Sequence, residues 1–235
     1  MLDDINVLAV KTGMLYDEAT VLAVASTLKK YYEKKPLQLV CDPVCVSGSG
    51  DVILQDSALG SLIDEILPLA TLITSNTSEA ELILSHKRKK GTISSLADLV
   101  YASEELLTLG PKAVLLTGGF VTTTIMEVRA LMATNHGISV YKHGLLDENM
   151  NILQIGLDEE GRSPRLAVDV LQESCGSGGE TEASIFIRPW IESTSIRRAG
   201  CTLSAAIVCG LARGLTSNFC PFFTLLEANR GRFST

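Results

Sequence analysis

The sequence predicts an α/β fold in which a mostly parallel sheet carries helices on both faces. Two observations predict this class. Short apolar runs of strand length alternate with longer segments of helical periodicity through the first half of the 235 residues, and such alternation is typical of βαβ units. Polar and glycine-containing segments directly follow several of the apolar runs. In a parallel sheet those positions meet at the carboxyl edge, where ligands bind.

The first half of the chain contains four segments that we expect to be strands. Each is short and almost continuously apolar, as strands buried on both faces are. They cover residues 5–10, 37–41, 70–74 and 112–116.

Helices are expected between these strands, because their apolar residues recur at helical spacing and their ends carry capping or breaking residues. Asp17 is the expected N-cap of the first helix, and Pro68 and Gly110-Pro111 end two others. The expected helices cover residues 17–32, 57–67, 78–84 and 94–109.

The second half has weaker periodicity. Residues from about 121 to 165 lose the strand–helix rhythm and are expected to form an irregular insertion. Strands are expected at 166–171 and 184–187, and a helix at 202–212. This last helix is apolar nearly all round and should be buried on most sides, Cys209 included. We expect one domain over residues 1–235, with a divergent tail from about 215 to 235.

Composition excludes several function classes. The net charge of −7 gives no electrostatic basis for binding nucleic acid or anionic membranes. Six cysteines in a chain of this length suit a reducing compartment, and no Cys/His spacing indicates structural zinc. No apolar run is long enough to cross a bilayer, and the acidic start lacks a signal peptide. The expected location is the cytoplasm.

Residues suited to phosphate chemistry follow the expected strands in order. They are Lys11-Thr12-Gly13-Met14, Asp42-Pro43-Val44, Asn76 with Glu79, and Thr117-Gly118-Gly119, and Gly200-Cys201-Thr202 stands at a helix start. The sheet should bring all five segments to one edge. Backbone N–H groups at the start of the last helix would attract an anion.

Each of these segments also has a purely structural interpretation. Asn76 and Glu79 are one helical turn apart, so they suit a magnesium–phosphate cluster or a helix-capping box, and the two roles are compatible. Asp42 could organise metal or phosphate, or simply form a turn before Pro43. Met14 could cover a planar ring or fill the core. The Gly118-Gly119 pair could admit a nucleotide or form a turn.

Cys201 carries the same ambiguity. A helix N-terminus lowers the pKa of a thiol, which would make a functional cysteine plausible at this position. The alternative is a small buried residue that closes the helix start.

Taken together, these segments resemble the hydroxymethylpyrimidine/phosphomethylpyrimidine kinases of thiamine biosynthesis, which have a ribokinase-like fold. The matching motifs are Lys-Thr-Gly-Met-Leu at 11–15, Asp-Pro-Val at 42–44, Leu-Pro-Leu-Ala-Thr-Leu-Ile-Thr at 67–74, Asn76 with Glu79-Ala80, and Gly-Cys-Thr-Leu-Ser-Ala-Ala-Ile at 200–207. Residues 169–171 and 191–195 resemble fungal members in particular. The resemblance covers about residues 1–120 and 166–214.

The resemblance implies transfer of the ATP γ-phosphoryl group to a pyrimidine hydroxymethyl group or its monophosphate, with Mg²⁺. It implies a pyrimidine and ATP as partners and allows a homodimer. By motif position, the implied catalytic residues are Cys201 and Gly200. The substrate-binding residues are Met14, Gly13 and Val44, the nucleotide-binding residues Asp42, Thr117, Gly119 and Thr202, and the metal-binding residues Asn76 and Glu79.

Three departures from the family pattern suggest alternative functions. The family opens with a strand–loop–helix segment that has no counterpart before Met1, so we expect the fold to lack it. Ile196 to Thr202 replaces Thr-His-Gly-Thr-Gly-Cys-Thr and puts Arg198 where close phosphate approach requires glycine, and Thr117 replaces a lysine. One alternative is therefore an inactive paralogue that acts as a binding or regulatory module.

The other alternative is a related kinase for pyridoxal or a sugar. Cys201 argues against sugar kinases, which carry aspartate at this position.

Overall fold

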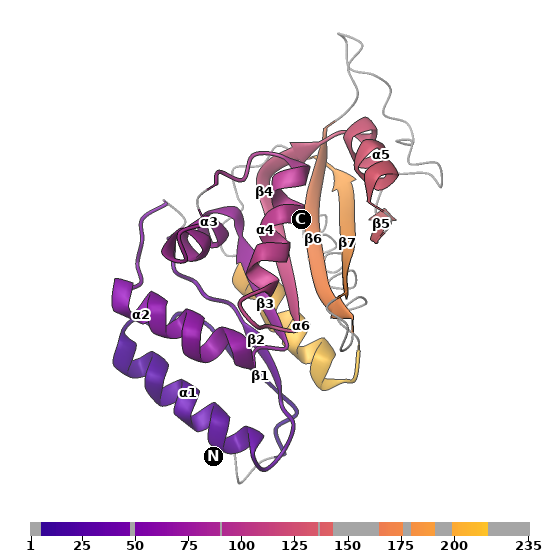
Figure 1. The fold of residues 1–235 in the computed structure, drawn as a ribbon. Coiled ribbons are helices and arrows are strands. Elements are labelled where there is room, and N and C mark those ends of the chain that lie inside the picture. Colours follow the sequence, from indigo (N-terminus) through magenta and orange to yellow (C-terminus); the bar gives the residue numbers. More distant parts are fainter. Residues whose placement is uncertain are drawn as a thin grey trace, which may run out of the picture.

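The computed structural model describes residues 6–47, 50–89, 91–135, 137–142, 165–175, 180–190 and 199–215. Within them one sheet has the strand order β1-β2-β3-β4-β6-β7-β5 (Figure 1). The strands are β1 (Ala9–Thr12), β2 (Gln38–Cys41), β3 (Leu72–Asn76), β4 (Ala113–Thr123), β5 (Ile138–Lys142), β6 (Leu166–Cys175) and β7 (Glu180–Pro189). Strands β1 to β4 are parallel, β6 is antiparallel to β4 and β7, and β5 is parallel to β7.

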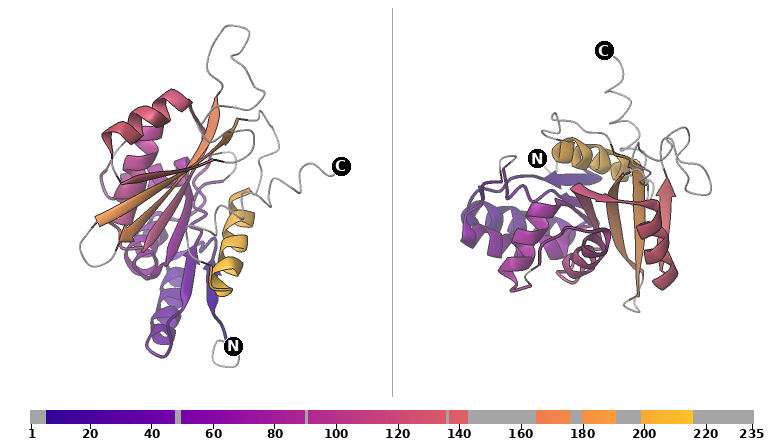
Figure 2. Two further views of the ribbon diagram at one scale, coloured as in Figure 1. Left: turned by 90° about the vertical axis from the view of Figure 1, so that its right-hand side faces the viewer. Right: turned by 90° about the horizontal axis from the view of Figure 1, so that it is seen from above.

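Helices cover both faces of the sheet, as predicted. They are α1 (Glu18–Tyr32), α2 (Asp56–Ser61), α3 (Thr77–His86), α4 (Leu96–Leu107), α5 (Ile125–Thr134) and α6 (Ala199–Ala212). Helix α2 continues as a π-helical turn (Leu62–Ile66) and a 3₁₀ turn that contains Pro68 (Leu67–Leu69). Figure 2 shows α6 on the face opposite α1 to α4.

Capping residues fix where the helices begin. The Asp17 side chain accepts a hydrogen bond from the Thr20 amide at 2.8 Å, so α1 begins as predicted. Ser95 and Asp98 form a reciprocal capping box that starts α4. Both helix starts could be predicted from sequence, because the N-cap residue comes directly before the segment whose apolar residues recur at helical spacing.

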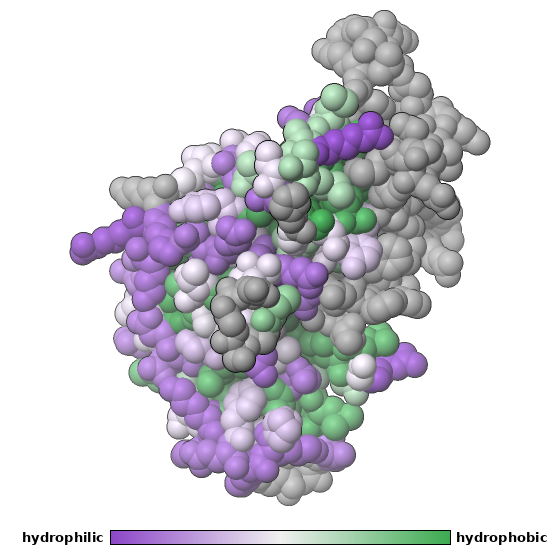
Figure 3. Space-filling model, turned by 45° about the vertical axis from the view of Figure 1, so that its right-hand side comes forward, coloured by the Kyte–Doolittle hydropathy of each residue, from purple (hydrophilic) through white to green (hydrophobic). Residues whose placement is uncertain are grey.

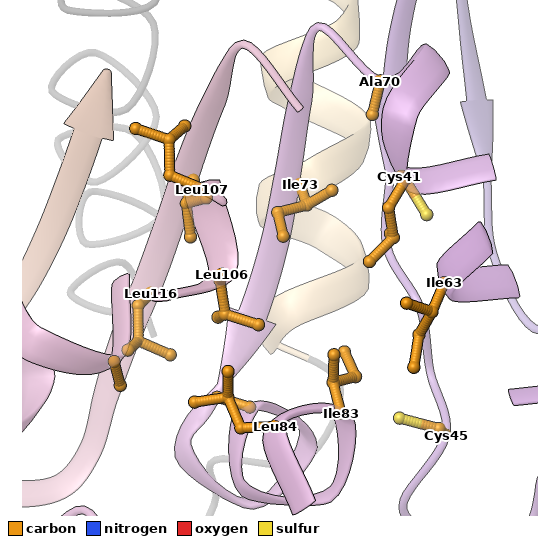
Figure 4. Packing of buried hydrophobic residues seen from close by; sticks show 14 of the residues in the cluster. Cys41, Cys45, Ile63, Ala70, Ile73, Ile83, Leu84, Leu106, Leu107 and Leu116 are labelled. Carbon is orange, nitrogen blue, oxygen red and sulfur yellow. The ribbon is translucent and has the colours of Figure 1, made fainter. Parts of the chain in front are cut away.

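The larger of two cores lies between the sheet and α1 to α4. Figure 4 shows Ile83 and Leu84 of α3 and Leu106 and Leu107 of α4 packed beside the strands, with Ile73 of β3 among them. Each fully buried aliphatic side chain contributes about 1.5–3 kcal/mol. The smaller core joins α6 to the other face through these residues: Val40, Leu72, Ala113, Leu115, Leu171, Phe186, Leu203, Ile207 and Leu211.

The structure corrects several expected boundaries. Strand β1 ends at Thr12, so Lys11 lies in the strand, and β4 continues past Gly118 and Gly119 to Thr123. Most described residues between 121 and 142 are regular, because they form the end of β4, α5 and β5. Residues 143–164 of the expected insertion and residues 216–235 of the expected tail lie outside the described residues.

Helix α6 is more exposed than its composition predicts. Leu203, Ile207 and Leu211 are buried, whereas Cys209 is exposed on another side of the helix. The expectation that Cys209 is buried is therefore wrong. Small residues make the outward side of α6 apolar in composition, but no other described element packs against that side.

One face of the described surface is mostly polar. Figure 3 shows hydrophilic side chains over much of the surface drawn in colour, with hydrophobic ones in smaller areas between them. Among the helices of the described residues, none combines the length and the apolar character that crossing a bilayer requires.

Candidate active site

The site forms on the α6 face of the sheet, at the carboxyl ends of β1 to β4. Strand residues alternate between faces, and Val40 and Leu115 belong to the core under α6. Lys11 pairs with Val40 and Thr74 with Leu115 in the sheet register. The same register and alternation put Asn76, Thr117 and Asp169 on this face.

Asp42 is the centre of the first cluster. Its carboxylate lies 3.1 Å from Lys11 Nζ, and its Oδ2 accepts a hydrogen bond from Ser204 Oγ at 2.8 Å. Ser204 is fully buried on α6, so Asp42 couples the end of β2 to the start of that helix. The predicted convergence of residue 42 with residues 200–202 is therefore present.

Cys201 lies beside the same carboxylate. Burial, the charge of Asp42 and a hydrogen bond to Asp42 raise the pKa of the Cys201 thiol above its usual value. The helix N-terminus acts in the opposite direction and lowers the pKa of a thiol. A protonated thiol at neutral pH suits a positioning role better than that of a base.

Asn76 and Glu79 form the capping box of α3. Asn76 Oδ1 accepts from the Glu79 amide at 2.9 Å, and Glu79 Oε2 accepts from the Asn76 amide at 3.1 Å. The structural interpretation of this pair is therefore confirmed. It leaves the second carboxylate oxygen of Glu79 outside the capping box.

Glu79 is also electrostatically coupled to the Asp42 cluster. Its side chain is buried, and burial raises the pKa of Glu79 to about 7. The hydrogen bond from the Asn76 amide lowers this pKa, and the negative charge of Asp42 raises it. A nearby cation would stabilise the ionised form of such a buried carboxylate. No group of three His, Cys, Asp or Glu side chains in the described ranges could hold a metal ion. Two carboxylates fit Mg²⁺ that arrives with substrate phosphates and water.

An unsatisfied hydroxyl lies on the same face. Thr74 is buried on β3, and its Oγ1 has no hydrogen-bond partner among the described residues. Buried polar atoms without partners are rare and often mark the place of a ligand or water. The orphaned hydroxyl therefore fits a site that binds a polar ligand.

The second cluster surrounds a bulge in β4. Thr117 pairs with Asp169 of β6, but the next paired residue, Thr122, is opposite Ala167. The extra residues of β4 therefore leave the ladder between Thr117 and Thr122. A Cβ at Gly118 would overlap the Val168 carbonyl oxygen, which explains this glycine by packing.

Gly119 serves the bulge in a different way. It has φ +59°, the left-handed region that favours glycine, and it is exposed. Phe120 follows with 83% of its surface exposed, so the bulge projects into solvent. A ligand could approach the backbone at Gly119 but not through Gly118.

Asp169 anchors this bulge and was not identified as a functional residue from sequence. It is 2% exposed; its Oδ1 accepts from the Gly118 amide at 3.0 Å, and its Oδ2 contacts Arg188 Nη1 of β7. An acidic residue inside the apolar strand at 166–171 was the available signal. No comparable signal marked Ser204 or Arg188, because serine is common in helices and arginine in exposed strands.

The three residues expected to contact the pyrimidine, Met14, Gly13 and Val44, differ in exposure and in backbone conformation. Met14 is 47% exposed, which rules out the core-packing alternative. A Cβ at Gly13 would lie 3.4 Å from Lys11 Nζ, so this glycine leaves room for the ammonium group. Val44 has φ +32°, a strained value for a β-branched residue next to the Asp42 cluster.

The first turn of α6 completes the rim of the site, which is the set of residues at the carboxyl ends of β1 to β4 and at the start of α6. Gly200, Cys201 and Thr202 lie in the first turn of α6, and all three are exposed. The backbone amides of Gly200 and Cys201 belong to the first turn of the helix, where amides have no acceptor within the helix itself. Arg198 and residues 191–195, which carry part of the family resemblance, lie outside the described residues.

The sheet and its helices define a fold of the ribokinase-like class. A family model described as phosphomethylpyrimidine kinase matches residues 1–151. The chain belongs to the phosphomethylpyrimidine kinase family.

Individual relatives agree with this assignment. The chain is 40% identical over 121 residues to the hydroxymethylpyrimidine/phosphomethylpyrimidine kinase of Mycobacterium tuberculosis, covering 52% of this chain and 42% of the relative. It is 30% identical over 210 residues to the putative hydroxymethylpyrimidine/phosphomethylpyrimidine kinase 2 of the fungus Schizosaccharomyces pombe, covering 89% of this chain and 31% of the relative. The chain thus spans less than half the length of either relative.

A solved structure supports the fold. The ADP complex of Bacillus subtilis pyridoxal kinase matches with a TM-score of 0.64 and 25% identity, covering 95% of this chain and 64% of that one. Related small-molecule kinases therefore share this architecture.

Proposed function

We propose that this chain transfers the γ-phosphoryl group of ATP to hydroxymethylpyrimidine and to its monophosphate, in thiamine biosynthesis. The observation that carries the proposal is the coupling of Asp42 to Lys11 and to Ser204 of α6, at the edge where β3 and β4 also end. Phosphoryl transfer requires charge neutralisation and alignment above all. This rim offers an ammonium, two carboxylates and the N-terminus of a helix.

The chain's residues divide the work as follows. The amides at Gly200 and Cys201 stabilise the anion that develops during transfer. Asp42 and Glu79 would hold Mg²⁺ together with substrate phosphates, and Asn76 keeps Glu79 in place through the capping box. Bound MgATP supplies the phosphoryl group.

The pyrimidine lies on the β1 and β2 side of the rim in this proposal. Met14 is exposed and available to cover the ring, and Gly13 and Val44 line its approach. The protonated Cys201 thiol positions the attacking hydroxyl. Asp42, beside Cys201, is the proposed acceptor of the proton that the attacking hydroxyl releases.

The nucleotide extends toward β4 along the same face. Thr117 and the exposed backbone of Gly119 are its proposed contacts at the bulge, and Thr202 contacts the phosphates at the helix start. The free cysteines within the described ranges suit a reducing, cytoplasmic location. Homodimerisation stays a prediction, for light scattering of the purified protein to test.

The direct test is turnover. Purified chain, ATP, Mg²⁺ and hydroxymethylpyrimidine should yield ADP in a coupled assay, and Asp42→Asn should lower kcat by at least about 100-fold, because it weakens both the Lys11 contact and the proposed metal site. An exposed acid on α4, Glu104, gives the matched control Glu104→Gln.

Other outcomes separate the alternatives. Nucleotide binding without transfer to any substrate would favour the inactive binding module. Faster transfer to pyridoxal than to the pyrimidine would favour the pyridoxal-type kinase, whose fold this chain shares.

A further inference from the structure

The β4 bulge has a cation beside it that the proposed function leaves unused. Arg188 lies at the end of β7, two residues beyond Phe186, which pairs with Asp169. Because β7 runs parallel to β4, this position lies toward the carboxyl edge of the sheet, and alternation puts Arg188 on the α6 face. Its partner on β6 is Ala167, which has a small side chain.

Asp169 joins Arg188 to the bulge. One carboxylate oxygen accepts from the Gly118 amide and the other contacts the Arg188 guanidinium, so the guanidinium and the bulge are separated only by the width of a carboxylate. The Asp169 side chain is 2% exposed and the Arg188 side chain 29% exposed. Part of the Arg188 side chain is therefore accessible, and the contact with Asp169 fixes the position of the guanidinium.

The other cations near the rim are engaged differently. Lys11 contacts Asp42 at the far end of the site. Arg165 lies over the Trp190 ring, with 6.0 Å between guanidinium carbon and ring centroid, and is one residue before β6 begins. Arg188 is the described cation that a buried carboxylate holds against the bulge.

The spacing of the two clusters matches an extended ligand. Asp42 follows β2 and Asp169 belongs to β6, so the clusters are three strands apart, or about 14 Å at the usual strand spacing. A nucleotide whose terminal phosphate lies at the α6 N-terminus would therefore have its inner phosphates nearer to the bulge.

We propose that Arg188, held in place by Asp169, is the cation that binds the inner phosphates of the nucleotide at the β4 bulge. This assignment rests on the proposed kinase function. A guanidinium suits the role because its planar set of donors can bind phosphate while it still contacts Asp169. Asp169 acts as a positioning residue for both Arg188 and Gly118.

Calorimetric titration with ATP, ADP and adenosine tests the assignment without requiring turnover. Arg188→Gln would leave Asp169 buried without its cation, so the main variant is the double change Asp169→Asn with Arg188→Gln. Asparagine at 169 retains an oxygen that can accept from the Gly118 amide. We expect ATP and ADP to bind about ten-fold or more weakly to this variant, in line with the loss of a charged hydrogen bond, and adenosine to bind unchanged.

Two further variants complete the design. Arg188→Lys retains the charge and should recover part of the lost affinity for ADP. Arg213→Gln removes an exposed cation just past the end of α6 and should change no affinity, which controls for the net charge of the protein. Thermal unfolding of each variant shows whether it is folded.

The possible results separate this inference from the function on which it rests. Nucleotide binding by the wild type that is unaffected in the double variant and in Arg188→Lys would overturn the role of Arg188 alone. An equal loss of adenosine binding would also overturn it, because the effect would then not involve phosphate. No binding of any nucleotide by the wild type would overturn both the kinase proposal and the role of Arg188.

Discussion

At the scale of single residues, the site depends on acidic side chains that are withdrawn from water. Glu79 is held by the Asn76 amide in the α3 capping box, and its buried carboxyl has a pKa of about 7. Asp42 and Asp169 are also buried, and each contacts one cation. Burial makes each carboxylate sensitive to the loss of a partner.

Glu79 should make the stability of the protein depend on pH. The unfolded-state pKa is 4.5 and the folded-state pKa about 7, so the folded protein holds this proton more tightly. The stability that protonation provides is present below pH 4.5 and is lost as the pH rises toward 7, at most about 1.4 kcal/mol per pH unit. Glu79→Gln should remove this component, because glutamine does not titrate but can still accept from the Asn76 amide.

The measurement is urea unfolding of both proteins in Mg²⁺-free buffer from pH 5 to 7.5. The stability of Glu79→Gln relative to wild type should increase steadily across this range. The control Glu104→Gln, at an exposed site, should follow the wild type. A constant difference between Glu79→Gln and wild type would contradict the prediction.

Ser204 should contribute to stability and to turnover together. Its buried hydroxyl donates to Asp42 at 2.8 Å, so Ser204→Ala removes a hydrogen bond to a charged group and should cost about 1.5–3 kcal/mol. Ser103→Ala is the matched control, because that fully buried hydroxyl donates to Val100 O in its own helix, at 2.7 Å. We expect a smaller loss there, about 1 kcal/mol, and unchanged kcat.

Chemical denaturation and the coupled assay on both serine variants test this pair. Equal losses of stability in the two variants would mean that Ser204 is an ordinary core hydroxyl. Unchanged kcat in Ser204→Ala would remove the functional part of the prediction.

At the scale of elements, the β4 bulge is the feature that a strand prediction could not supply. The apolar run at 112–116 predicted a strand, and Gly118-Gly119 suggested that the strand ended in a turn. The strand instead continues to Thr123, because Asp169 binds the Gly118 amide and the Val168 carbonyl fills the space beside Gly118. Both partners come from β6, about 50 residues later in the chain, so local sequence could not reveal them.

Gly118→Ala should therefore be strongly destabilising. The added methyl group would overlap the Val168 carbonyl oxygen, and the backbone must move or the bulge must rearrange. We expect a loss of at least about 2 kcal/mol in unfolding free energy, in the range of overpacking changes. Gly91→Ala, where no atom lies within 4 Å of the new Cβ, should change stability by less than about 1 kcal/mol.

Urea unfolding of the two variants gives the comparison. Equal stabilities for Gly118→Ala and Gly91→Ala would show that the bulge yields easily. The role of Asp169 as its anchor would then be weakened as well.

At the scale of the whole molecule, sequence predicted the parallel half of the sheet better than the antiparallel half. Strands β1 to β4 lie between well-capped helices, so the positions of Asp42 and Asn76 followed from the alternation alone. Strands β6 and β7 form a ribbon whose direction depends on pairing with β4, which leaves no local signal. The sequence therefore indicated the convergence of Asp42 with Cys201 but not the Asp169–Arg188 half of the site.

The two halves of the site together predict how the molecule responds to nucleotide. The Asp42 cluster joins β1, β2 and α6, and the Asp169 cluster joins β4, β6 and β7. A ligand that contacts both clusters binds the folded state alone, since the unfolded chain cannot bring these residues together. MgADP at 100 times its dissociation constant should then raise the unfolding free energy by about 2.7 kcal/mol.

Hydrogen exchange with MgADP bound should slow in α6 and in β4 near Gly118, whereas a ligand held by one cluster alone would protect only one of these elements. Protection confined to α6 would show that the nucleotide does not reach the bulge, and the two-cluster description of the site would be wrong.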